Sequence, residues 1–150
     1  MNLIATYKRF EKFPAGKTLF SKVLGRMIPY SNTIHARVEN LEAGYAKVVM
    51  RDRRAVRNHL NSVHAVALMN LGELASGLAM VGGLPSNLRG ILVGYRMEYF
   101  KKARGTLTAE ARCTVPNVTE RQEHILPVDI KNEAGDTVCR AHATWLIGPV

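Results

Sequence analysis

Residues 62–81 are almost all apolar or small, and this stretch constrains the fold more than any other part of the chain. Drawn as a helix, it carries apolar side chains all round its surface, which is typical of a helix buried in a protein interior. Asn61-Ser62 offers capping groups at its start, and Gly82-Gly83 predicts its end. The sequence therefore predicts one long buried helix over about residues 63–82.

The same stretch approaches the length of a membrane-spanning helix, but Glu73 stands near its middle. A carboxylate at that depth of a bilayer is expensive, so we expect no membrane span. The start of the chain carries Lys8, Arg9, Glu11 and Lys12 before any apolar run long enough for a signal peptide. We therefore expect a cytoplasmic protein.

Apolar and polar residues alternate with period two in several segments, which is typical of half-buried strands. These segments are residues 33–40, 45–51, 93–99, 107–115, 126–130 and 139–147. The last four follow the buried helix with turn signals between them, so we expect them to form a meander. Residues 5–30 instead repeat apolar positions at helical spacing, broken by Pro14-Ala15-Gly16 and closed by Pro29, which predicts one or two short amphipathic helices.

About six antiparallel strands and one wholly apolar helix predict an α+β fold in which a curved sheet wraps around that helix. We expect a single domain over residues 1–150, with a helical segment at 1–30 and the core at 31–150. A sheet that covers one helix still leaves edges and an open face. Self-association of two such sheets, as a dimer or a tetramer, is therefore expected.

The chain carries 21 Lys and Arg against 12 Asp and Glu, a formal net charge of +9. Charge alone does not distinguish a solvated surface from a site for nucleic acid or for a small polyanion. Basic side chains interleaved with aromatic ones, typical of RNA binding, are not evident, and we expect no nucleic acid partner. Cys113 and Cys139 have no CxxC or Cys/His neighbours, so neither a zinc site nor a disulfide framework is expected.

Glu73 is the anomaly of the buried helix, because an ionised carboxylate in apolar surroundings destabilises a fold unless it is paired or used. A structural contact is one explanation, either an ion pair with an arginine such as Arg57 or Arg96 or a position in a hydrated dimer interface. A catalytic role is the other, and the polar residues that precede the helix favour it. These are Asn58, His59, Asn61, Ser62 and His64.

The start of a helix presents free backbone N–H groups, and that of Ala65 is placed to hold the oxygen of a polarised carbonyl. His64 and Glu73 are nine positions apart, so at about 100° per residue their side chains leave opposite sides of the helix. The side chains of His64 and Glu73 in one chain are therefore not expected to contact the same substrate molecule. The spacing therefore favours a site shared between two copies of the chain.

The residues from Asn58 to Ala65, followed by Glu73, resemble the signature of hotdog-fold acyl-CoA thioesterases of the phenylacetic-acid-pathway type. That signature is an Asn, five residues, a His usually followed by two glycines, and an Asp or Glu nine positions after the His. Asn58, His64 and Glu73 match both spacings. The resemblance extends from about residue 30 to the end of the chain and implies the hotdog fold.

The resemblance implies that Glu73 is the general base or nucleophile that attacks the thioester. It implies that the Ala65 N–H forms the oxyanion hole, that Asn58 orients water or the carbonyl, and that His64 shapes the loop. Ala65-Val66 replaces the two glycines, and Asn61 stands where a glycine often provides a positive φ, a conformation that Asn tolerates.

A further departure lies early in the strand after the helix, where some relatives have a Ser or Thr. That position is Leu92, or nearby Ile91, in this chain. A second hotdog chemistry is also open, because 3-hydroxyacyl dehydratases place a His about fourteen positions before a Glu, as His59 stands before Glu73. The Pro and Gly that normally follow such a His are missing here.

Basic residues cluster at 51–57 and at 101–104. Hotdog relatives commonly receive the coenzyme A nucleotide at a turn like the second cluster, so we expect Lys101, Lys102 and Arg104 to bind its phosphates. The sequence analysis thus predicts a thioesterase for small or medium acyl-CoA, with no metal and no cofactor besides the coenzyme A of the substrate. A non-catalytic acyl-CoA-binding protein remains an alternative.

Overall fold

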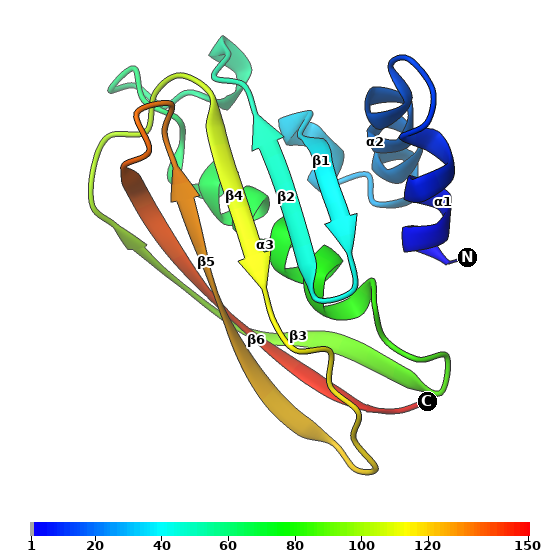
Figure 1. Ribbon diagram of the computed structural model, residues 1–150. Helices are drawn as coiled ribbons and strands as arrows, with labels where there is room; N and C mark the ends of the chain where they lie inside the picture. Colours follow the sequence, from blue (N-terminus) through cyan, green and yellow to red (C-terminus); the bar gives the residue numbers. More distant parts are fainter. Residues whose placement is uncertain (1) are drawn as a thin grey trace.

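The computed structural model describes residues 2–150 and contains one six-stranded antiparallel sheet that curves around a long helix (Figure 1). The α-helices are α1 (Leu3–Phe10), α2 (Gly16–Met27) and α3 (Ala65–Val81), and two short 3₁₀ helices are η1 (Ser31–Ile34) and η2 (Arg54–Val56). The strands are β1 (Arg37–Glu42), β2 (Tyr45–Met50), β3 (Leu88–Tyr99), β4 (Leu107–Arg112), β5 (Gln122–Lys131) and β6 (Thr137–Pro149). This is the hotdog fold that the sequence predicted.

Strand order in the sheet is β1-β2-β4-β5-β6-β3, so the expected meander of the last four strands is wrong in one place. β3 does not pair with β4, which follows it in the chain; it pairs with β6 and forms the far edge of the sheet. The burial of the two strands explains why β6 is inside the sheet and β3 is at its edge. β6 is buried at almost every second position, whereas β3 is only partly buried along its length, as suits an edge strand.

The first predicted strand begins later than its alternation indicated. Residues 31–34 form η1, and the backbone of His35 is left-handed at φ 48° before β1 starts at Arg37. Local hydrogen bonds compete with strand pairing here, because the Thr33 hydroxyl donates to the Tyr30 carbonyl and the His35 N–H donates to that of Asn32. His35 was therefore wrongly placed in a strand, and β4 likewise ends at Arg112 rather than near residue 115.

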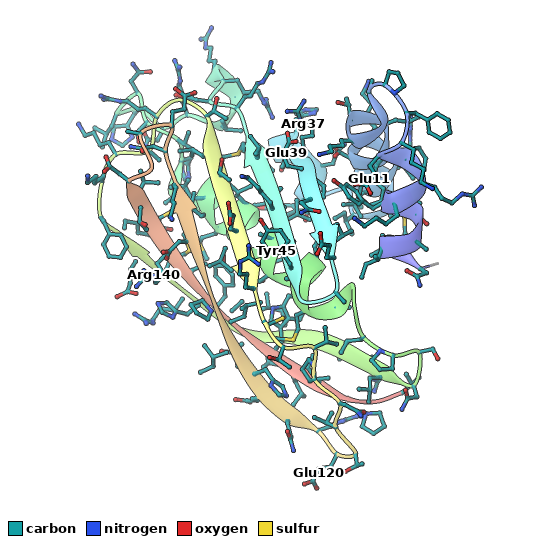
Figure 2. The ribbon with its side chains drawn as sticks, viewed as in Figure 1. Glu11, Arg37, Glu39, Tyr45, Glu120 and Arg140 are labelled. Atoms are coloured by element: carbon teal, nitrogen blue, oxygen red, sulfur yellow. The ribbon has the colours of Figure 1, made fainter. Side chains whose placement is uncertain are left out.

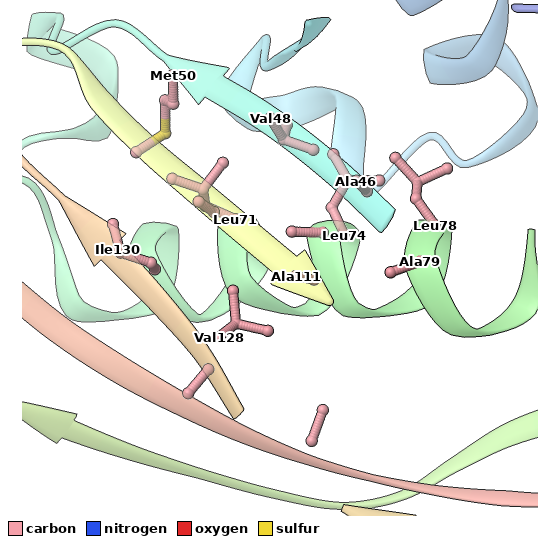
Figure 3. Close-up of a cluster of buried hydrophobic side chains, with 14 of the residues drawn as sticks. Ala46, Val48, Met50, Leu71, Leu74, Leu78, Ala79, Ala111, Val128 and Ile130 are labelled. Atoms are coloured by element: carbon pink, nitrogen blue, oxygen red, sulfur yellow. The ribbon is translucent and has the colours of Figure 1, made fainter. Parts of the chain in front are cut away.

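The core lies between α3 and the concave face of the sheet, as predicted (Figure 3). Leucines of α3 pack against alternate positions of the strands, and the side chains labelled there include Leu71, Leu74, Val48, Val128 and Ile130. The helix lies close to the sheet because Gly72 has no side chain. A Cβ at Gly72 would stand 2.5 Å from the Tyr95 hydroxyl and 2.9 Å from the Ala141 Cβ.

The N-terminal helices lie beside β1, at the opposite edge of the sheet from β3 (Figure 1). Pro14 and Ala15 separate them, as the sequence indicated, and Gly16 allows the sharp reversal because an added Cβ would overlap the Phe10 carbonyl oxygen. Tyr7 and Phe20 meet edge to face, with ring centroids 5.2 Å apart, and join the helices to the core. No helix within residues 2–150 is long and apolar enough to cross a membrane.

Candidate active site

The loop before α3 is organised by the side chain of Asn58. Its Oδ1 accepts hydrogen bonds from the N–H groups of Leu60 (3.0 Å) and Ser62 (3.2 Å), and its own N–H donates to the Ser62 carbonyl at 2.8 Å. Asn61 closes this turn with φ 53°, the positive value expected for the residue that replaces a glycine. Asn58 Nδ2 has no acceptor among residues 2–150, so it is the part of the carboxamide that remains to bind a substrate or a water molecule.

His64 is the N-cap of α3, not the expected Asn61-Ser62 pair. Its Nδ1 accepts a hydrogen bond from the Val66 N–H at 3.1 Å, which places the ring proton of the neutral imidazole on Nε2. The backbone of His64 is held as well, because its N–H donates to the Val56 carbonyl. With Val66 capped in this way, the Ala65 N–H has no acceptor among residues 2–150 and is available at the positive end of the helix dipole.

Glu73 lies eight residues into α3, on the side of the helix that faces β3 and β6. Gly77 is one turn further along; a Cβ there would lie 4.0 Å from Glu73 Oε1 and 3.3 Å from the Trp145 ring. Trp145 of β6 and Tyr95 of β3 both donate hydrogen bonds to this side of the helix. The Trp145 indole donates to the Ser76 hydroxyl at 3.2 Å, and the Tyr95 hydroxyl donates to the Met69 carbonyl at 2.9 Å.

The Glu73 carboxylate forms neither a hydrogen bond nor an ion pair with any residue of 2–150. The two arginines considered as partners are engaged elsewhere, because Arg57 binds Asp52 and Arg96 binds Glu98. Burial raises the pKa of Glu73 above its ordinary value. Burial also raises the pKa of Tyr95, and the nearby Glu73 charge adds to that effect. Glu73 is thus a partly buried acid without a structural partner among residues 2–150.

The two halves of the candidate site are separated along the helix axis. Glu73 comes eight positions after Ala65, which corresponds to about 12 Å along the helix at 1.5 Å per residue. α3 is continuous from Ala65 to Val81, so no break at Gly72 brings the two groups together. Within one chain the structure therefore gathers Asn58, His64 and Ala65 at the start of α3 and leaves Glu73 apart from them.

The basic segment 101–104 packs against the Asn58 loop. The Val63 N–H (2.8 Å) and the Ser62 hydroxyl (3.0 Å) both donate to the Ala103 carbonyl, and Arg104 Nε donates to the Asn61 carbonyl at 3.0 Å. This segment was expected to be a turn between neighbouring strands, but it connects β3 to β4, which do not pair. The crossover brings the predicted phosphate-binding residues to the predicted catalytic loop.

The three basic side chains of this segment differ in what they can still bind. Lys101 forms an ion pair with Asp136 at 3.1 Å, whereas Lys102 has no carboxylate partner in residues 2–150. Arg104 uses one of its five N–H donors on Asn61, so the rest of its guanidinium is available. The segment thus keeps part of its capacity to bind an anion.

Sequence reasoning missed the role of the first basic cluster. A hollow beside the loop is lined by Arg54, Arg57, Asn58, His59 and Asn61. Asp52 holds this region in place, because its carboxylate accepts from Arg57 Nε at 2.6 Å and from the Gly105 N–H at 3.2 Å. The hydrogen bond from Arg57 is the main cause of the low pKa of Asp52. The sequence signal that could have indicated this role is Asp52, the acidic residue within the basic segment 51–57.

Two of the other histidines lie in strands, and one of them has a partner that the sequence did not indicate. His142 on β6 contacts Glu98 on β3, with 2.7 Å between Nε2 and Oε2. The two residues are diagonal neighbours across the pair, because His142 is opposite Arg96. Their side chains lie on the outer face of the sheet, and the alternation of the strands separates them from α3. Within residues 2–150 no three His, Cys, Asp or Glu side chains form a group that could hold a metal ion.

Solved structures share this fold over most of their length. A structural-genomics protein has a TM-score of 0.85 and 29% identity, covering 99% of each chain. A Pseudomonas aeruginosa protein of unknown function, named a probable thioesterase, has a TM-score of 0.79 and 22% identity over 92% of this chain and 97% of its own. A Haemophilus influenzae thioesterase has a TM-score of 0.71 and 15% identity over 84% and 88%.

A comparison with curated proteins found no match. The family model described as a domain of unknown function, DUF4442, matches residues 16–147. That range begins with the first residue of α2 and ends two residues before the end of β6, so it includes nearly all of the sheet, α3 and the Asn58 loop. The chain therefore belongs to the DUF4442 family and has the hotdog fold.

Proposed function

We propose that the chain hydrolyses acyl-CoA thioesters at a site that two copies of the chain form together. The observation that carries the proposal is Glu73, a partly buried carboxylate on the buried helix that has no partner in the described part of the chain. Two proteins of similar structure, one named a probable thioesterase and the other a thioesterase, support the same chemistry. An acid in this position costs stability, and a catalytic base is a reason to retain it.

In the proposed reaction the Glu73 carboxylate accepts a proton from a water molecule, whose oxygen attacks the thioester carbonyl carbon. The electron pair of the C=O bond moves to the oxygen, which accepts a hydrogen bond from the Ala65 N–H. The C–S bond then breaks, and the departing sulfur takes the proton that Glu73 carried. Water and thioester give a carboxylic acid and a thiol, and Glu73 is ionised again.

Two copies are needed because Ala65 and Glu73 are about 12 Å apart along α3. If two α3 helices run antiparallel across a two-fold axis, the start of one lies beside the middle of the other, and an isologous dimer has two identical sites. In each site Asn58 and Ala65 of one copy face Glu73 of the other. His64 acts as a positioning residue that caps the helix and directs the Ala65 N–H.

The phosphates of coenzyme A are proposed to lie on the basic surface beside the Asn58 loop. Lys102 contributes a point charge and Arg104 the free part of its guanidinium, while Lys101 contributes less because Asp136 already pairs with it. The acyl group is proposed to be small or medium. Glu73 supplies the base itself, so we expect no metal requirement and equal turnover with and without a chelator.

The test is release of free thiol from a panel of acyl-CoAs by the wild-type protein, Glu73→Gln and Glu123→Gln. Glu123 is an exposed glutamate on β5 and serves as the matched control. We expect Glu73→Gln to lower kcat by about 10²- to 10⁴-fold and Glu123→Gln to leave it unchanged. If wild type and Glu73→Gln bind acyl-CoA but neither releases thiol, the chain is a non-catalytic acyl-CoA-binding protein.

A dehydratase remains the second candidate because His59 is exposed in the same hollow as Asn58. Hydration of a 2-enoyl-CoA that is lost in His59→Ala, with no thiol released by the wild type, would favour it over the thioesterase. We expect the opposite result. No residue among 2–150 holds the His59 ring, whereas a general acid or base must be oriented towards its substrate.

A further inference from the structure

A second hollow, of about 420 Å³, lies between α2, η1 and the first two strands. We call it the α2–β1 pocket. Its basic side chains are Lys22, His35, Arg37, Arg51 and Arg53, and no Asp or Glu lines it. It shares no residue with the candidate active site. Figure 2 labels Arg37 at one end of β1, beside α2.

Three of the cations in the pocket have no carboxylate partner among the described residues. Arg37 forms an ion pair with Glu39, but Lys22, Arg51 and Arg53 have no carboxylate partner in residues 2–150. Arg53 Nη2 donates to the Thr33 carbonyl at 2.5 Å, and Arg53 Nε is buried without any hydrogen-bond partner in that part of the chain. Unpartnered buried donors are rare in native proteins, and a site for a polar ligand is one of their ordinary explanations.

The fold itself brings these residues together. Arg37 lies opposite Val49 in the β1–β2 pair, and Arg51 follows two residues later, just past the end of β2 and on the same face, so both arginines line the pocket. η1 and its left-handed end at His35 then return the chain towards β1. Lys22 comes from the adjoining helix. Like charges held this close repel each other unless an anion lies between them.

We propose that the α2–β1 pocket binds an organic phosphate of about nucleotide size. Arginine forks match pairs of phosphate oxygens, and two or three of them favour a phosphate over a carboxylate of lower charge. Apolar contacts are also available, because Ile34, Ala36 and Val49 belong to the lining. The volume lies within the range of small-molecule sites. The phosphate can come from a free nucleotide or from the nucleotide end of a coenzyme A thioester.

The experiment is calorimetric titration of the full chain with adenosine 3′,5′-bisphosphate and, separately, with pyrophosphate. The variant is Lys22→Ala/Arg51→Ala, because neither side chain makes a hydrogen bond or ion pair within residues 2–150. The matched control is Arg9→Ala/Lys12→Ala, which removes the same charge from exposed positions of the N-terminal segment. We expect the pocket variant to bind the bisphosphate at least about tenfold more weakly and the control to bind it like wild type.

Equal losses in the two double variants would overturn the proposal, because they would show attraction by net charge alone. Absence of binding by the wild type at roughly millimolar probe would also overturn it. Thermal unfolding checks that the variants fold, and Lys22→Ala alone, at an exposed position of α2, replaces the double variant if that does not fold.

A second titration separates the two sources of the phosphate. If the bisphosphate binds wild type that is already saturated with coenzyme A, the ligand is a free nucleotide. If coenzyme A blocks it, and the pocket variant loses affinity for coenzyme A, the pocket holds the nucleotide end of the thioester, in place of the surface beside the Asn58 loop proposed above. Both results support the pocket, and both use binding alone, so they do not depend on whether the chain hydrolyses a thioester.

Discussion

The two edges of the sheet are built in opposite ways. At β1, side chains of the N-terminal helices form hydrogen bonds with backbone groups of the edge strand. Tyr7 and Lys17 donate to the Glu39 carbonyl, and Ser21 Oγ accepts from the Val38 N–H. At β3 no element of residues 2–150 lies beyond the strand, and Ile91 and Val93 are about half exposed. One edge is closed within the chain, and the other is open along twelve residues.

This difference indicates where a second copy would bind in the proposed dimer. Long unpaired edges with apolar side chains are templates for pairing, and native proteins normally protect them. Glu73 lies on the side of α3 that faces β3, so the open edge and the unpartnered acid belong to the same side of the molecule. The closed edge carries no comparable acid. A dimer formed at β3 would cover both features at once.

The largest effect is expected when the site is divided between two chains. Asn58→Ala and Glu73→Ala homodimers should each be nearly inactive, because each lacks one half of every site. Unfolding and refolding a mixture should restore roughly a quarter of wild-type activity, since half of the dimers are mixed and each of these has one intact site. No recovery, with both parents folded and dimeric, would place the whole site within one chain.

A charge on the open edge should separate the copies. Val93→Lys places like charges near each other at a β3–β3 contact, so we expect its dimer dissociation constant to rise by at least about tenfold and its activity to fall with it. Ile125→Lys is the control, because Ile125 is an equally apolar and more exposed side chain on the inner strand β5. Sizing with light scattering distinguishes them, and an undisturbed Val93→Lys dimer would contradict the role of β3.

The elements that the sequence predicted well are those whose signal is local. α3 was predicted because burial on all sides leaves an apolar composition, and the positive φ of Asn61 because few other residues tolerate it. The proximity of Asn58 and Ala65 followed from their closeness in the chain. These features need no knowledge of what packs against them.

The features that were wrong or missed depend on distant partners. The pairing of β3 with β6 is decided by which strand fills the middle of the sheet, and the contact between His142 and Glu98 follows from that pairing. Asp52 gains its role only when the Gly105 N–H arrives from another part of the chain. The cap by His64 was missed for a different reason, because imidazole is an uncommon capping group.

At the closed edge, Tyr7→Phe should cost about 1–2 kcal/mol of the free energy of unfolding, because it leaves the Glu39 carbonyl with one donor fewer. Urea unfolding at pH 8 measures the loss, and activity and dimerisation should stay unchanged. Tyr30→Phe is the control, since Tyr30 is exposed and its hydroxyl has no partner in residues 2–150. An effect on dimerisation would mean that the two edges are coupled.

The same tyrosine gives a pH dependence. Burial, with the nearby charges of Glu11, Glu39 and Glu42, raises the pKa of Tyr7 from 10.0 to about 12. A raised pKa in the folded chain means that the stabilisation is complete below pH 10 and is lost as the pH rises towards 12. Wild type should therefore lose stability faster than Tyr7→Phe across this window. If the free energies of unfolding of the two proteins fall in parallel with pH, Tyr7 ionises as readily in the folded chain as in the unfolded one.

At the open edge, Glu73→Gln should raise the free energy of unfolding at pH 7, by less than the Tyr7 effect because the carboxylate is only partly buried. Burial raises the pKa of Glu73 above 4.5, so its stabilising contribution is present below that pH and is lost as the pH rises through the folded-state value. The gap between Glu73→Gln and wild type should consequently widen from pH 4 to pH 7, while Glu123→Gln shows none. Urea unfolding at one protein concentration measures it. A variant less stable than wild type at pH 7 would mean that the Glu73 carboxylate accepts a hydrogen bond from the second copy. Glu73 would then stabilise the dimer contact at the open edge.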